Sequence, residues 1–348
     1  MKNIPSAVQS IEIIRRFSEA GLPHVGSGKT GELFENPRYP DYLLMYRTDR
    51  VSIFDFVLPT PVPGKGSVLT AMPILWLLYG GISDVLKKFD GHHIAQFGSV
   101  VDDFLPNALH SDREIQTRTL VIRRFQKPQI ESIVRGFLTG SGFDSYDRTG
   151  AVCGHNLPSG LHDGSRLPFP IYTPTTKADS GHDEHVDYLT TRKRYGIEPE
   201  NLSIKLFEAA SRYAETRNLL IADAKFELSG STLIDEFLTP DTMRIWKTSD
   251  WKAAQTKNPP KAPGGYDKQY LREWGKSVST PFRDDSGLPI VGVHRLDPEN
   301  PEHIEFVSSL LVPEKVIAKT SDLYHELPEL LFGISLDTFW RDQGKVAI

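Results

Sequence analysis

The chain has 348 residues, of which 39% are hydrophobic and 24% charged, and its 40 basic and 45 acidic residues give a net charge of −5. This composition excludes a mostly disordered chain, a coiled coil and a collagen, and the length suits about two domains of roughly 150 residues. An acidic chain is a poor general binder of nucleic acid, because such binding comes from neutralising phosphates. Local basic clusters can still hold small phosphorylated ligands.

The cellular setting follows from cysteine usage and hydropathy. The single cysteine, Cys153, permits no disulfide within the chain, which favours a reducing compartment. The N-terminus lacks the layout of a signal peptide. The most apolar stretch, Val68 to Tyr79, has 12 residues, whereas a membrane span needs about 20. We therefore expect a cytoplasmic protein with no membrane or nucleic-acid partner, as a monomer or a homodimer.

The first predicted element is an amphipathic N-terminal helix. A capping box at Ser6 precedes it, Gly21 ends it, and four apolar residues line it at helical spacing: Val8, Ile11, Ile14 and Phe17. The pattern then predicts strands within residues 41–60, a helix over 69–86 that bends at Pro73, and strands over 120–125 and 132–138.

The second half begins with a segment of little periodicity. Residues 140–190 are rich in Gly, Pro, Asp and Thr, which predicts a long loop that is either functional or disordered. A helix over 202–217, a strand over 219–228 and helices near 302–311 and 321–332 follow. Strands come first and helices later, so the order predicts an α+β fold.

A glycine-rich stretch, Gly26 to Thr30, resembles the end of a phosphate-binding P-loop. The full pattern would need a glycine where Pro23 stands, and Pro37 and Pro40 exclude the helix that must follow. We interpret the stretch as a turn that presents Lys29 to a phosphate.

The strongest candidate site lies in a predicted hairpin. Asp223, Lys225 and Glu227 alternate with apolar residues, so they share one face of the strand. A three-residue turn over 229–231 would place Asp235 on that face, and a two-residue turn would place it on the other. Two carboxylates and a lysine suit magnesium and ATP phosphates. The alternative is a solvated amphipathic hairpin without chemistry.

Two further clusters have ligand-binding character. Arg135 ends an apolar strand just before residues 139–142, Thr-Gly-Ser-Gly, which together suit a sugar phosphate. The loop over 173–184 carries Lys177 and Asp183. Two histidines three apart in this region do not indicate zinc, because no further His or Cys lies at ligand spacing.

Short motifs in a fixed order carry a family resemblance. They are Gly28-Lys29, Thr48 to Asp55, Pro63 to Gly66, Glu131 to Gly136 with Thr139 to Ser141, Leu157 to Leu161, Thr173 to Lys177, Asp223 to Glu227, Asp235-Glu236 with Thr239 to Trp246, and Asp267 to Gln269. Each is weak alone, but together, from about Gly28 to Trp274, they resemble the SAICAR synthetase (phosphoribosylaminoimidazole-succinocarboxamide synthase) family.

The resemblance implies a fold and an activity. The fold would have two α+β lobes, antiparallel sheets with flanking helices, distantly like kinases and ATP-grasp enzymes, with an N-terminal lobe over 1–126 and a C-terminal lobe over 127–348. The activity would be an ATP- and Mg²⁺-dependent ligase of purine biosynthesis. It would join carboxyaminoimidazole ribonucleotide to L-aspartate through an acyl phosphate, giving SAICAR, ADP and phosphate.

The resemblance also implies roles for individual residues. Nucleotide contacts would come from Gly28, Lys29, Glu131 and Asp235, magnesium ligation from Glu227 and Asp235, and catalysis from Lys225, Asp223 and Lys177. Substrate binding would fall to Arg135, Ser141 and Arg244 at the ribonucleotide phosphate, and to Asp241, Ser52, Asp55 and Asp183 near the reacting groups.

This chain departs from the family pattern at two places near the expected nucleotide. The family usually has a second basic residue where this chain has Gly31, and Ala71 to Trp76 replaces a serine-aromatic run. These departures leave open a relative that uses the same ATP-dependent amide-forming chemistry on another carboxylate or amine. A third class is a non-catalytic nucleotide-binding protein or a phosphotransferase.

Overall fold

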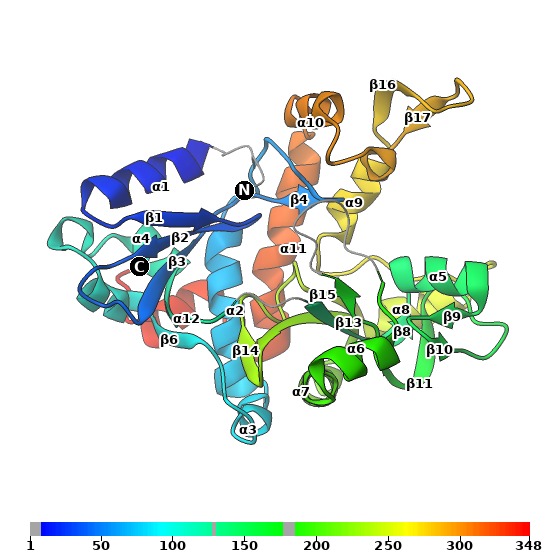
Figure 1. The fold of residues 1–348 in the computed structure, drawn as a ribbon, viewed down its shortest axis with the longest axis horizontal. Helices are drawn as coiled ribbons and strands as arrows, with labels where there is room; N and C mark the ends of the chain where they lie inside the picture. The colour runs from blue at the N-terminus through cyan, green and yellow to red at the C-terminus, as the bar shows by residue number, and fades with distance from the viewer. Residues whose placement is uncertain (1–7, 127–129, 177–184) are drawn as a thin grey trace.

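The computed structural model describes residues 8–126, 130–176 and 185–348 and shows two main antiparallel sheets with helices between and around them (Figure 1). This arrangement confirms the expected α+β class. No helix in those three ranges is long and apolar enough to cross a membrane.

The N-terminal sheet has five strands in the order β1 (His24–Ser27), β2 (Gly31–Glu35), β3 (Tyr42–Arg47), β7 (Thr119–Arg123) and β6 (Ile94–Phe97). α1 (Val8–Glu19) packs on it through Ile13 and Phe17. The predicted glycine-rich turn joins β1 to β2, and the Gly28 N–H donates to the Gly31 carbonyl at 2.8 Å. A strand follows this turn where a P-loop would have a helix, so excluding the P-loop is confirmed.

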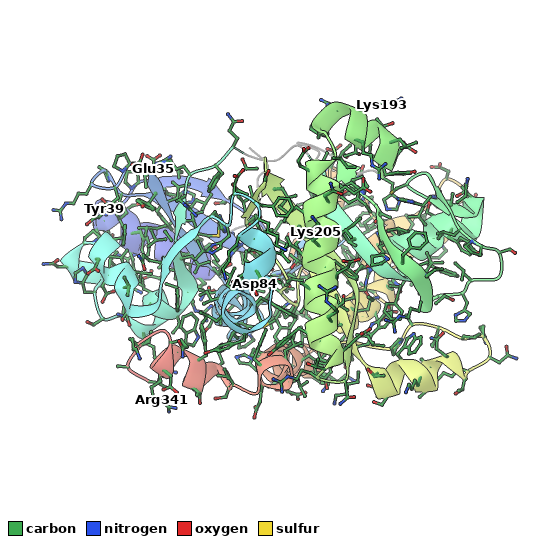
Figure 2. The ribbon with its side chains drawn as sticks, turned by 90° about the horizontal axis from the view of Figure 1, so that it is seen from below. Glu35, Tyr39, Asp84, Lys193, Lys205 and Arg341 are labelled. Carbon is green, nitrogen blue, oxygen red and sulfur yellow. The ribbon has the colours of Figure 1, made fainter. Side chains whose placement is uncertain are left out.

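The C-terminal sheet has six strands. Its main path is β11 (Ser165–Tyr172), β8 (Ile130–Leu138), β13 (Leu219–Ser229) and β14 (Thr232–Ile234), while β12 (Thr175–Thr176) pairs with β8 and β15 (Met243–Lys247) pairs with β13. α7 (Glu198–Glu215) contacts β13 and β8. In Figure 2 it carries Lys205 and runs beside α3 (Ser83–Leu86), which carries Asp84.

Two long helices stand between the sheets: α2 (Lys65–Tyr79) and α11 (Glu314–Phe332) (Figure 1). One continuous apolar cluster includes Met45 of β3, Trp76 of α2, Phe226 of β13 and Leu327 of α11. α12 (Leu336–Asp342) returns to the N-terminal sheet, where the Phe339 ring stacks on Phe97 of β6. The two-lobe boundary at residue 126 stays a prediction.

The other elements are short. They are β4 (Ser52–Ile53), β5 (Phe56–Val57), η1 (Gly98–Phe104), η2 (Asn107–Leu109), α4 (Arg113–Arg118), α5 (Ser141–Thr149), β9 (Ala151–Val152), β10 (His155–Asn156), α6 (Tyr188–Tyr195), α8 (Thr248–Gln255), α9 (Gln269–Lys276), β16 (Ser279–Arg283), β17 (Pro289–Val291), η3 (Val293–Arg295) and α10 (Pro301–Ser308).

The prediction of a loop over 140–190 is wrong. Its described parts hold α5, β9, β10, β11 and β12 and the start of α6. Tyr146 is buried on the inner side of the short α5, while β11 is an edge strand that accommodates Pro168 and Pro170. The two prolines argued against a strand in the sequence. An edge strand tolerates them because not every backbone N–H in it has to donate to a neighbouring strand.

Two helix predictions need smaller corrections. The helix expected over 69–86 begins at Lys65 and ends at Tyr79, and Gly80 and Gly81 separate it from α3. The inner face of α1 is also displaced: Ile13 is 3% exposed, whereas Ile11 is 57% exposed. Hydrophobicity alone did not distinguish these two isoleucines.

The turn between β13 and β14 also differs from the prediction. Ser229 pairs with Thr232, so the turn has two residues rather than three. Gly230 has φ +59°, as glycine at the first position of a tight hairpin turn can adopt. Asp235 therefore does not reach its place through strand register; it lies just beyond β14.

Candidate active site

Charged residues concentrate on one face of the C-terminal sheet. Asp223 pairs with Arg135, and Lys225 pairs with Ile133, so the odd-numbered residues of β13 and β8 share a face. Asp223 is 7% exposed and Glu227 only 4%. The solvated-hairpin alternative is therefore wrong, because these charges are buried against partners rather than hydrated.

Asp223 lies between two arginines. Its Oδ2 accepts from Nη1 of Arg135 at 2.9 Å and from Nη1 of Arg244, which β15 supplies. Arg135 also donates from Nη2 to Ser141 Oγ at 3.1 Å, at the start of α5. The predicted grouping of Arg135, Ser141 and Arg244 is thus present as one network.

The backbone beside this network has no room for side chains. Gly140 has φ +56°, and a Cβ there would lie 2.6 Å from Nη2 of Arg244. Burial lowers the pKa of Arg135, while the Asp223 carboxylate acts in the opposite direction. The arrangement is a tightly packed cluster of guanidinium groups, a type of side chain that binds phosphate by forked hydrogen bonds.

A second cluster is centred on Lys225. Its Nζ lies 2.7 Å from Glu131 Oε1 and 3.5 Å from Glu227 Oε1. Burial opposes the charged form of Lys225, yet the fields of Glu131, Glu227 and Asp235 hold its pKa well above the ordinary value. Lys225 therefore stays protonated among three carboxylates.

Asp235 is placed by contacts outside its own strand. It has φ +53°, and its Oδ1 accepts from Nη2 of Arg47, at the end of β3, at 2.9 Å. Although the predicted register is wrong, Asp235 thus lies close enough to act on Lys225. No set of three or more His, Cys, Asp or Glu in the described ranges is arranged to hold a metal ion.

The glycine-rich turn meets the β4–β5 hairpin at the edge of the N-terminal sheet. Lys29 Nζ lies 2.5 Å from Asp55 Oδ1, and Ser52 is buried in β4. Arg50 Nη2 donates to the Gly28 carbonyl at 2.8 Å. The structure thus brings Gly28, Lys29 and Asp55 together.

Asp241 lies in a charged cluster that the sequence predicted only in part. Lys65 Nζ of α2 is 3.0 Å from Asp241 Oδ2, Lys268 Nζ is 3.9 Å away, and Tyr324 of α11 donates to Oδ1 at 2.5 Å. Lys65 and Lys268 lie within the motifs that carry the family resemblance, but the sequence alone gave neither lysine a role in the site. Tyr324 lies beyond them, and its helical apolar surroundings gave no signal of a site.

The two clusters around Asp223 and Asp241 are connected. Arg272 of α9 is within electrostatic range of Arg244, Asp267 and Asp241. The cationic side chains of this region lie among carboxylates that include Asp223, Asp241, Asp267 and Glu236; the cations are Lys65, Arg135, Arg244, Lys268 and Arg272. Lys177 and Asp183 lie outside the described residues.

A large cavity of about 710 Å³ occurs elsewhere. Its lining includes Ser67, Arg118, His325 and Trp340, between α2, α4, α11 and α12. The predicted site residues that the structure describes are not among those lining it. We therefore place the candidate active site on the charged face of the C-terminal sheet and not in this cavity.

Comparison with known proteins gives a consistent result. The family model described as SAICAR synthetase matches residues 24–288. A phosphoribosylaminoimidazole-succinocarboxamide synthase of Saccharopolyspora erythraea is 35% identical over 327 residues, covering 91% of this chain and 96% of that protein.

Solved structures have the same fold. SAICAR-synthase from Saccharomyces cerevisiae, complexed with SAICAR, superposes with a TM-score of 0.70 at 26% identity, covering 90% of this chain and 96% of that one. A SAICAR synthetase (Type-2) in complex with ADP has a TM-score of 0.54 at 17% identity, covering 89% and 98%. Since the family match runs from β1 past β15 and contains every site residue predicted from the sequence, this chain belongs to the SAICAR synthetase family.

Proposed function

We propose that this enzyme joins the carboxylate of carboxyaminoimidazole ribonucleotide to the amine of L-aspartate, with ATP converted to ADP and phosphate. The observation that carries the assignment to this site is the placement of two clusters on one sheet face. The arginines around Asp223 suit a phosphorylated substrate, and the carboxylates around Lys225 suit a metal-bound nucleotide.

The ribonucleotide phosphate would bind where Arg135, Ser141 and Arg244 converge. The two guanidinium groups and the Ser141 hydroxyl already share one hydrogen-bonded network. Asp223 accepts from both arginines and so holds them in place. Asp241, Ser52 and Asp55 complete the proposed substrate contacts, together with Asp183.

The nucleotide would lie between the two sheets, with Gly28 and Lys29 on one side and Glu131 and Asp235 on the other. Glu227 and Asp235 would hold Mg²⁺, which in proteins is commonly bound by one or two carboxylates plus phosphates and waters. The hard oxygen donors fit that ion, and its charge would neutralise the transferring phosphate.

The chemistry follows from the weakness of a carboxylate as an electrophile. A carboxylate oxygen of the ribonucleotide attacks the γ-phosphorus of ATP, and ADP leaves. The amine of aspartate then attacks the acyl carbon, loses a proton, and phosphate leaves as the amide forms. Lys225, Asp223 and Lys177 would orient and neutralise the reacting groups, so catalysis is mostly positioning and electrostatics. We further propose a cytoplasmic location and a monomer or homodimer.

The pH dependence of ribonucleotide binding is expected to follow Lys268. Burial lowers the pKa of Lys268 to about 8, so the side chain is cationic below that pH and neutral above it. The KM for the ribonucleotide is expected to rise roughly tenfold through the window from about pH 8 to pH 10, because an anion loses one cationic contact.

Two variants check this assignment. Lys268→Arg stays charged and should flatten the profile, whereas Lys268→Met should raise the KM below about pH 8 and match the wild type near pH 10. Between about pH 8 and 10.5 the unfolded lysine binds the extra proton, so this group makes the free energy of unfolding of the unliganded protein rise with pH. An unchanged profile in Lys268→Arg would contradict the assignment.

An omission assay tests the proposed function. ADP release is measured with magnesium-ATP, carboxyaminoimidazole ribonucleotide and L-aspartate, leaving out each in turn, and the product is identified by mass. Turnover is expected only when all are present. Turnover that persists without aspartate would refute the ligase. A folded, ATP-binding but inactive protein would direct the search to other carboxylates and amines.

A further inference from the structure

We propose that Arg47 is a positioning residue of the nucleotide site: it ties the glycine-rich turn to the acidic loop after β14 and sets the direction of the Asp235 carboxylate. This inference rests on the proposed role of Asp235 toward Mg²⁺ and nucleotide. It adds a residue that sequence motifs did not identify, and it connects the two sheets at the place where the nucleotide would bind.

The Arg47 guanidinium joins groups from two distant segments. Nη2 donates to Asp235 Oδ1 at 2.9 Å, and Nη1 donates to Thr30 Oγ1 at 3.0 Å. Nη1 also lies 3.5 Å from Glu236 Oε2, which accepts from the Thr30 hydroxyl at 3.3 Å. The Arg47 side chain is 6% exposed, so water competes little for these contacts.

Asp235 needs such an external contact. β14 ends at Ile234, and Asp235 has φ +53°, a left-handed conformation that residues other than glycine adopt rarely. Strand register therefore does not direct its side chain. The ion pair with Arg47 anchors Oδ1, while 39% of the Asp235 side-chain surface stays exposed, as a ligand for an incoming metal ion requires.

Gly31 explains why the cation comes from β3. Gly31 pairs directly with Arg47, and a Cβ at position 31 would lie 2.6 Å from the Tyr46 carbonyl oxygen and 3.4 Å from Arg47 Cδ. The first distance is too short for any side chain unless the backbone moves. The position that usually carries a basic residue in the family is thus closed here, and Arg47 brings a positive charge to the turn from the opposite strand.

The contacts of Arg47 are separate from the ribonucleotide pocket. Arg135 and Arg244 pair with Asp223, whereas Arg47 pairs with Asp235 and Glu236. Loss of Arg47 should therefore impair the nucleotide half of the reaction selectively. If Arg47 had only a structural role, its loss would instead weaken the binding of both substrates alike.

The test compares Arg47→Met and Arg47→Lys with Arg124→Met as a matched control. Arg124 follows β7 in the same part of the chain, and its ion pair with Glu35 is 41% and 37% exposed. In Arg47→Met, we expect the KM for magnesium-ATP to rise about tenfold or more and the ribonucleotide KM to change less than about twofold. The KM for magnesium-ATP in Arg47→Lys should fall between those of the wild type and Arg47→Met. Arg124→Met should have the same KM values as the wild type.

Calorimetry with magnesium-ADP separates this inference from the proposed function, because it needs no turnover. In the Arg47 variants, the dissociation constant for magnesium-ADP should rise in parallel with the KM for magnesium-ATP. In an Asp235→Asn background, Arg47→Lys should have little further effect, since both changes then act on one interaction. Unchanged magnesium-ADP binding in Arg47→Lys and Arg47→Met, equal losses for both substrates, or additive effects with Asp235→Asn would each overturn the proposal. Wild-type protein that binds magnesium-ADP but does not turn over would refute only the proposed reaction.

Discussion

Glu227→Gln is expected to lower turnover about a hundredfold to a thousandfold, the largest effect of a near-isosteric change in this site. Glu227 is 4% exposed, and its carboxylate lies 3.5 Å from the Lys225 ammonium. Glutamine keeps the shape but removes the charge that would hold Mg²⁺. The loss should be measured as ADP release at saturating substrates, and higher Mg²⁺ should restore part of it.

A surface change provides the control for this experiment. Glu35→Gln alters a glutamate whose side chain is 37% exposed, and turnover should not change. Melting temperatures of both variants show whether the fold is intact. A folded Glu227→Gln enzyme with the normal rate would remove Glu227 from the metal site.

Asp223→Asn is expected to destabilise the unliganded protein by about 3–5 kcal/mol, because it leaves two buried guanidinium groups without their shared counter-charge. Arg135 and Arg244 both donate to Asp223 Oδ2, and their side chains are 2% and 18% exposed. Denaturant unfolding gives the difference in free energy directly. We also expect kcat/KM for the ribonucleotide to fall at least about a hundredfold.

Inorganic phosphate distinguishes this electrostatic explanation from a simple packing defect. Phosphate should raise the melting temperature of Asp223→Asn more than that of the wild type, because the variant pocket carries more uncompensated positive charge. Asp337→Asn, at a side chain 71% exposed, should change stability by less than about 0.5 kcal/mol. Equal responses to phosphate in wild type and Asp223→Asn would argue against an anion pocket at Arg135.

The sequence was informative wherever strand alternation controls the site. Asp223, Lys225 and Glu227 face the same way because side chains in a strand have a period of two, and Arg135 faces them because β8 pairs with β13. The family motifs then predicted the reaction and the roles of individual residues, which strand alternation alone cannot predict. The fold class followed from the order of strands and helices for the same local reasons.

The sequence was less informative where placement depends on turns and distant contacts. One residue of difference in the β13–β14 turn changed the expected face of Asp235, and its actual position depends on Arg47, 188 residues earlier. Lys65 and Tyr324 reach Asp241 only because α2 and α11 pack together. No local pattern contains that information.

The contact between Tyr324 and Asp241 has a consequence for synthesis on the ribosome. The Lys65 ammonium, the Asp241 carboxylate and the Tyr324 hydroxyl come from three widely separated parts of the chain. A nascent chain that has emerged only as far as α9 contains every motif residue of the proposed ribonucleotide site but lacks α11. The folding intermediate at that stage would hold Asp241 without its tyrosine partner, so full binding competence arises only after the late helix docks.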